Sequence, residues 1–118
     1  MRRIAVSVAA AVAMAAIILV PAHGKTAGLK GEVGPGFDIE VKKGSVDVKR
    51  IKAGTYKMPI EDKSSAHNFH LKGPGVNKKT GVGFVGKKTW TVTLKPGKYT
   101  YQCDPHATAG MKGTFRVT

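Results

Sequence analysis

Hydrophobic and polar residues alternate along most of the chain from residue 37 onward. Phe37, Ile39 and Val41 alternate with Asp38 and Glu40, and the same period of two recurs further along. The later alternating runs are Tyr56, Met58 and Ile60; His67, Phe69 and Leu71; Trp90, Val92 and Leu94; Tyr99, Tyr101 and Cys103; and Phe115 and Val117. A period of two is typical of strands with one buried face, whereas an amphipathic helix has a period of 3.6. The pattern therefore predicts strands throughout residues 37–118.

Glycine and proline separate these runs at regular intervals. The turn signals are Gly44-Ser45, Ala53-Gly54, Gly73-Pro74-Gly75, Pro96-Gly97 and Gly110. Many short strands with such corners indicate an all-β sandwich or barrel. Residues 23–36 contain five glycines and one proline, which indicates a flexible N-terminal segment with a short first strand near Leu29–Val33. We therefore expect one domain over residues 37–118, preceded by this segment.

The first 22 residues have a different character. Arg2 and Arg3 precede an uncharged apolar run from Ile4 to Val20, and small residues end the segment at Ala22. This order predicts a secretory signal peptide over residues 1–22, cleaved after Ala22. The run is just long enough that an uncleaved membrane anchor is the alternative. Both interpretations place the rest of the chain outside the cytoplasm, in the periplasm, at the cell surface or in the extracellular space.

The chain is strongly basic. Twenty Lys and Arg residues against seven Asp and Glu residues give a formal net charge of +13. The basic residues are scattered singly and in pairs, and export argues against nucleic acid as a partner. A solvated surface and a surface that attracts anionic proteins or membranes both fit this composition. The charge alone does not choose between them.

The residues with metal-binding chemistry gather near the C-terminal end. The single cysteine, Cys103, excludes an internal disulfide and a four-thiolate site within one chain. His106 follows it by three residues, and Met111 follows His106 by five. Thiolate and thioether are soft donors and imidazole is intermediate, a mixture that suits copper better than structural zinc. A blue-copper site has two histidines, so a second histidine is needed.

Two histidines in the segment Ala66–Leu71 are candidates for this second position. His67 shares its strand face with the apolar residues Phe69 and Leu71, whereas His70 lies on the opposite face. A ligand of a buried ion projects from the core side, which favours His67 and leaves His70 as the alternative ligand.

The motif resembles that of the small cupredoxins of the plastocyanin, pseudoazurin and amicyanin type. The Cys103-x-x-His106-x-x-x-x-Met111 spacing and the His67-Asn68 pair carry the resemblance, which extends over residues 37–118 to the Gly-Thr-Phe-Arg-Val ending at Gly113–Val117. It implies a Greek-key β-sandwich of about eight strands, with one copper ion at one end. It also implies His67, Cys103, His106 and Met111 as ligands and Asn68 as the residue that ties the His67 strand to the Cys103 loop.

We expect a monomeric one-electron carrier. The chain shows no Ser/His/Asp set and no paired catalytic carboxylates, and four protein ligands leave no open position at the metal, which argues against an enzyme. The partner of the carrier would be a redox protein, of acidic character given the basic surface. We expect an apolar docking patch beside His106, formed by Ala107, Ala109 and Gly110 with Gly73-Pro74-Gly75. Copper buffering or delivery is the alternative function, and a metal-free structural domain is a third. The acidic patch of plant plastocyanins is absent, so a photosynthetic role does not carry over.

Overall fold

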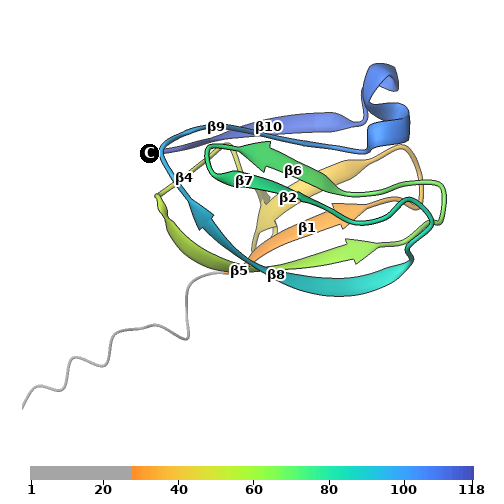
Figure 1. The fold of residues 1–118 in the computed structure, drawn as a ribbon, viewed down its shortest axis with the longest axis horizontal. Helices are drawn as coiled ribbons and strands as arrows, with labels where there is room; N and C mark the ends of the chain where they lie inside the picture. Colours follow the sequence, from red (N-terminus) through yellow and green to blue (C-terminus); the bar gives the residue numbers. More distant parts are fainter. Residues whose placement is uncertain (1–27) are drawn as a thin grey trace, which may run out of the picture.

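Two five-stranded sheets pack face to face in the computed structural model, which describes residues 28–118 (Figure 1). The expected all-β Greek-key sandwich is confirmed. The expected signal peptide, residues 1–22, lies outside the described residues, as does the beginning of the 23–36 segment. Within residues 28–118, no helix has the length and hydropathy needed to cross a bilayer.

The first sheet has the strand order β3-β2-β1-β5-β8. Its strands are β1 (Leu29–Val33), β2 (Ile39–Lys43), β3 (Val46–Asp47), β5 (Gly54–Asp62) and β8 (Gly86–Leu94). β1 is antiparallel to β2 but parallel to β5, whose other edge pairs with β8 along all nine residues. Strand β1 thus lies in the middle of a sheet. The residues of the expected flexible segment from Leu29 to Val33 belong to the folded domain.

The second sheet has the strand order β4-β10-β9-β6-β7. Its strands are β4 (Arg50–Ile51), β6 (His70–Gly73), β7 (Val76–Lys79), β9 (Gly97–Gln102) and β10 (Lys112–Val117). β4 and β10 are parallel, and the other neighbours are antiparallel. The described residues contain ten strands rather than about eight. The extra strands β3 and β4 have two residues each, too few for a period of two to show.

The core lies between the two sheets and consists of the apolar residues of the alternating runs. From the first sheet it includes Leu29, Val41, Met58, Ile60 and Val92, and from the second Leu71, Tyr99, Tyr101 and Phe115, with Phe69 directly before β6; all are buried. Tyr99 stacks on Phe115 with ring centroids 5.4 Å apart. Burial of such aromatic rings supplies much of the free energy that stabilises a thin sandwich.

The two ends of the sandwich carry different loops. At one end, β9 leads into a short 3₁₀ helix, η1 (Asp104–Ala109), which is the blue coil at the upper right of Figure 1. The loop from β5 to β6 reaches the same end, because His70 at the start of β6 pairs with Gln102 at the end of β9. The β6–β7 turn lies at the opposite end, where the Tyr99 hydroxyl donates to the Pro74 carbonyl at 2.7 Å.

Candidate metal centre

The segment from Cys103 to Met111 is a loop held closed by its own backbone. The Cys103 N–H donates to the Met111 carbonyl at 3.0 Å, and the Met111 N–H donates to the His106 carbonyl at 3.2 Å. Pro105 lies in the first turn of the 3₁₀ helix, where its missing N–H costs no hydrogen bond. Gly110 ends the helix at φ 97°, a left-handed conformation that favours glycine. These local features fix the spacing of the cysteine, the histidine and the methionine.

His67 reaches the same point from the β5–β6 loop. Its N–H donates to the Ser64 carbonyl at 3.3 Å, and the Lys63 N–H donates to the Val33 carbonyl at 3.0 Å, which anchors the loop to β1. His67 precedes strand β6 rather than lying within it. The alternation that turns the side chains of Phe69 and Leu71 towards the core nevertheless continues back to His67. Its side chain is buried, as the strand pattern predicts.

Three donor atoms from these two loops converge. His67 Nδ1 and His106 Nδ1 are 3.1 Å apart, and Cys103 Sγ lies 3.7 Å from the first and 3.4 Å from the second. Among residues 28–118, these three form the one group of at least three His, Cys, Asp or Glu side chains that could hold a metal ion, with one ligand atom from each within 4.8 Å of the others. Cys103 and His67 are buried, while His106 is partly exposed.

The triangle formed by the three atoms has the dimensions of a trigonal metal site. A point equidistant from all three lies roughly 2 Å from each, close to the bond lengths of about 2.0–2.3 Å that zinc forms with imidazole nitrogen and thiolate sulfur. Two imidazoles and one thiolate in a trigonal arrangement are the donor set of a blue-copper centre. The residues therefore fit a copper ion without rearrangement of the loops.

Met111 lies directly after this loop and is only 2% exposed. Its backbone bonds to both Cys103 and His106 keep it at the same end of the sandwich. The Met111 thioether is a soft donor that would suit a weak fourth ligand of a copper ion held by the other three residues.

His70, the alternative ligand, is not part of this cluster. Its Nδ1 lies 2.8 Å from Asp104 Oδ1, and its Nε2 lies 2.6 Å from Asn77 Oδ1. Both ring nitrogens are thus engaged on the outer face of the second sheet. The phase argument that distinguishes His67 from His70 agrees with this geometry.

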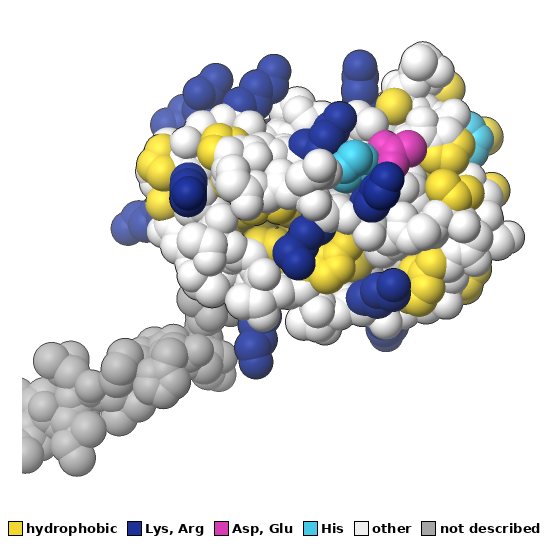
Figure 2. Space-filling model, in the orientation of Figure 1, with side chains coloured by type: hydrophobic (Ala, Val, Ile, Leu, Met, Phe, Trp, Pro, Cys, Tyr) yellow, Lys and Arg dark blue, Asp and Glu magenta, His cyan; other side chains and the backbone are white. Residues whose placement is uncertain are grey.

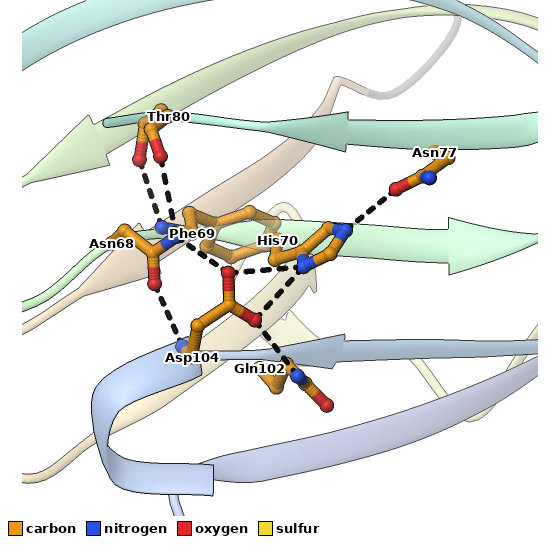
Figure 3. A network of polar contacts seen from close by, with 7 residues as sticks. All are labelled: Asn68, Phe69, His70, Asn77, Thr80, Gln102 and Asp104. Carbon is orange, nitrogen blue, oxygen red and sulfur yellow. Dashed lines mark hydrogen bonds and ion pairs between the residues drawn. The ribbon is translucent and has the colours of Figure 1, made fainter. Parts of the chain in front are cut away.

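Asn68 connects the His67 loop to the Cys103 loop (Figure 3). Its Oδ1 accepts from the Asp104 N–H at 2.7 Å, and its Nδ2 donates to Asp104 Oδ2 at 3.0 Å and to the Thr80 carbonyl at 3.2 Å. The Thr80 hydroxyl in turn accepts from the Phe69 N–H at 2.8 Å. Asn68 thus joins the two loops, as the resemblance implies, and Thr80 is a further member of this network that the sequence does not indicate.

Asp104 is the centre of this polar network, and its neighbours hold it ionised. Gln102 Nε2 donates to Asp104 Oδ1 at 2.8 Å, in addition to the contacts with Asn68 and His70. Burial alone would raise the pKa of Asp104, but the hydrogen bonds from Asn68, Gln102 and His70 outweigh it and lower the pKa to about 2. Sequence spacing gave no sign of this network, because its members come from three separate segments.

Phe37 also lies at the site. Its ring meets the rings of His67 and His106 edge-on, with centroids 5.6 Å and 4.8 Å away, although its own side chain is 71% exposed. The alternating pattern predicts Phe37 as an inward core residue of a strand, but it precedes β2 and covers the two imidazoles instead. A large exposed aromatic next to two histidines is a signal that only the structure provides.

The apolar surface at this end differs in part from the expected patch. Ala107 and Ala109 lie there on η1, but the turn Gly73-Pro74-Gly75 lies at the opposite end, so its expected place in the patch is wrong. The loop between β7 and β8 takes its place, with Val82 and Val85 more than half exposed. That loop is at the correct end because Gly86 pairs with Asp62, just before the His67 loop.

Comparison with known proteins also indicates a copper site. A family model described as copper-binding proteins of the plastocyanin/azurin family matches residues 36–118. Reduced rusticyanin is 26% identical, with a TM-score of 0.59 over 77% of this chain and 78% of that one. Rusticyanin from Thiobacillus ferrooxidans is also 26% identical, with a TM-score of 0.57 over 77% and 76%. A Cu(I) amicyanin variant, 14% identical with a TM-score of 0.51 over 78% and 83%, shares the fold. The chain therefore belongs to the plastocyanin/azurin family of copper-binding proteins, and copper is its metal cofactor.

Proposed function

We propose that this protein is a one-electron carrier whose copper ion is held by His67, Cys103, His106 and Met111. The observation that carries the proposal is the convergence of Nδ1, Nδ1 and Sγ within 3.1–3.7 Å of one another. Bound copper supplies the redox chemistry by alternating between Cu(I) and Cu(II). Four protein donors leave no open position for a substrate, which favours a carrier over an enzyme.

The contribution of the polypeptide is to hold the donors nearly still. Cys103 and Met111 are joined by a backbone hydrogen bond across the loop, and Asn68 ties that loop to the segment bearing His67. A rigid donor set changes little between the two oxidation states, so little reorganisation accompanies electron transfer. The polar network around Asp104 serves this rigidity from outside the donor set, as outer hydrogen bonds do in other metal sites.

The exposed apolar residues at the same end suit brief contact with a redox partner. Phe37, Val82 and Val85 are three of the four large hydrophobic residues that are exposed among residues 28–118. His106 is partly exposed beside Phe37, which offers a short path for the electron. The formal net charge is +13 for the whole chain and +11 without residues 1–22, and it favours an acidic partner and speeds encounter at low salt. The apolar run at residues 4–20 supports operation in the cell envelope, outside the cytoplasm.

Copper titration followed by visible absorption and electron paramagnetic resonance tests the proposal. We expect an intense blue band and a narrow copper hyperfine splitting, both lost in Cys103→Ser. His67→Ala should abolish the band, whereas the matched variant His70→Ala should retain it. A colourless copper-loaded protein, or greater damage from His70→Ala, would refute the ligand assignment.

A second measurement separates electron transfer from copper delivery. We expect the copper-loaded protein to exchange electrons rapidly with a small redox reagent while keeping its metal in the presence of a copper chelator of moderate affinity. Rapid loss of copper to the chelator with slow electron exchange would instead favour a delivery protein.

A further inference from the structure

Three cationic side chains form a row across the outer face of the second sheet. Arg50 on β4 is in register with Arg116 on β10, and Arg116 is in register with Lys98 on β9. All three are exposed, while their neighbours Ile51, Phe115 and Tyr99 face the core. Like charges directly opposite one another on neighbouring strands destabilise a sheet. This row therefore has an energetic cost within the isolated protein.

No acidic side chain forms an ion pair with this row in the part of the chain the structure describes. The Lys–Glu ion pairs found there all involve Glu32, Glu40 or Glu61, which belong to the first sheet. The remaining pair, His70 with Asp104, lies at the metal end of the second sheet. On the face shown in Figure 2, Lys and Arg side chains are widely spread, and acidic side chains form one small patch beside a histidine.

The cationic row borders a groove of about 290 Å³. Its lining consists of Lys49, Arg50, Lys98, Thr114, Phe115 and Arg116. The groove is open to solvent and is large enough to admit a phosphate or diphosphate group. Four of the six lining residues carry a positive charge, and Thr114 adds a hydroxyl donor.

The backbone fixes the relative position of the charges. The Arg116 N–H donates to the Lys49 carbonyl at 3.0 Å, and the Thr118 N–H donates to the Ile51 carbonyl at 3.0 Å. These bonds join the short strand β4 to the end of β10 and keep the two arginines side by side. A ligand therefore meets two arginine side chains whose backbone positions are already fixed.

We propose that this groove is a second binding site, for a phosphate-bearing anion, at the end of the sandwich away from the metal centre. Arginine presents several N–H donors in a planar fork that matches phosphate oxygens, and two arginines with two lysines suit a multiply charged group. Such a ligand relieves the repulsion along the row. Soluble phosphate compounds and lipid headgroups both carry this chemistry, and the experiment distinguishes the two sources.

Calorimetric titration of the copper-loaded full chain with sodium pyrophosphate, at fixed ionic strength, tests the site. We expect saturable binding of one anion, weakened at least tenfold in Arg116→Gln and in Arg50→Gln. The matched control is Lys57→Gln, which removes one exposed charge from the outer face of β5 and should change the affinity less than twofold. Thermal unfolding of each variant confirms that it is folded.

Two results would overturn the proposal. One is an absence of saturable binding at fixed ionic strength. The other is an equal loss of affinity in Arg116→Gln and Lys57→Gln, which would mean that the anion responds only to net charge. Because the groove is remote from Cys103, Cys103→Ser should bind pyrophosphate with unchanged affinity. The result is thus independent of whether the protein carries electrons.

Sedimentation with vesicles identifies the source of the phosphate. Binding to vesicles that contain phosphatidic acid, lost in Arg116→Gln and displaced by pyrophosphate, assigns the groove to a lipid headgroup. Pyrophosphate binding without vesicle binding assigns it to a soluble anion. Binding of polyglutamate that depends on Arg116, with no response to pyrophosphate, would assign the groove to an acidic protein and refute the proposal.

Discussion

Asn68→Ala removes the residue that joins the two metal-binding loops. Asn68 is 1% exposed and makes three hydrogen bonds, to the Asp104 N–H, to Asp104 Oδ2 and to the Thr80 carbonyl. Each bond contributes about 1 kcal/mol net, and a buried group left without a partner costs about 1–3 kcal/mol. We expect the free energy of unfolding to fall by about 3–5 kcal/mol, a large part of the roughly 5–15 kcal/mol that is typical of a domain.

Urea unfolding of the metal-free protein measures this loss. With a slope of about 1–3 kcal/mol per M, the midpoint should fall by at least about 1 M without a change in slope. Copper affinity should fall about 10–100-fold, as it does when outer hydrogen bonds of a metal site are removed.

Asn77→Ala is the matched control for this variant. Asn77 is exposed and makes one contact with the same network, at His70 Nε2. We expect it to lower the free energy of unfolding by less than about 1 kcal/mol. Equal destabilisation by the two variants would refute the reasoning that Asn68 holds the loops together.

Three further predictions concern acid stability, the far end of the sandwich and the cover of the histidines. Because hydrogen bonds lower the pKa of Asp104 from 3.8 to about 2, its ionised form stabilises the fold above about pH 4 and loses this effect as the pH falls towards 2. Above about pH 4 the protein should therefore be more stable than Asp104→Asn by about 1 kcal/mol, after allowance for the partly exposed carboxylate. Denaturant titrations should show this difference in the free energy of unfolding shrink as the pH falls towards 2, and a constant difference would contradict the reasoning. In Gly73→Ala the new Cβ overlaps the Tyr99 ring, so unfolding should become easier by about 1–3 kcal/mol, while the blue band of the folded, copper-loaded protein stays unchanged. Phe37→Ala should change stability by less than about 1 kcal/mol but speed chemical modification of His106 in the metal-free protein severalfold; an unchanged rate would show that the ring does not shield the imidazole.

The sequence predicts those features that depend on local periodicity. Leu29–Val33 forms a strand as its pattern indicates, and the inward phase of Phe69 and Leu71 places His67 rather than His70 next to Cys103. The assignment of ligands stays a prediction until copper is observed in the site.

The features that escaped prediction depend on which loops share an end of the sandwich. The turn at Gly73–Gly75 carries the same turn residues as any other corner, and only the pairing of β6 with β9 shows that it is remote from His106. The same holds for Asp104, whose partners Asn68, His70 and Gln102 come together through strand order. Periodicity reports which way a side chain faces but not which end of the molecule it occupies.

The position of β10 has a consequence for the route by which the protein folds. β10 lies between β4 and β9, so residues near position 50 must find residues near position 116 before the second sheet closes. Pairing between such distant segments raises the contact order and slows folding. Cys103 and His67, which are 36 residues apart in the sequence, likewise meet only when β6 has paired with β9. The rate at which blue colour grows after dilution from denaturant into copper-containing buffer should therefore report the rate of the last, slow stage of folding.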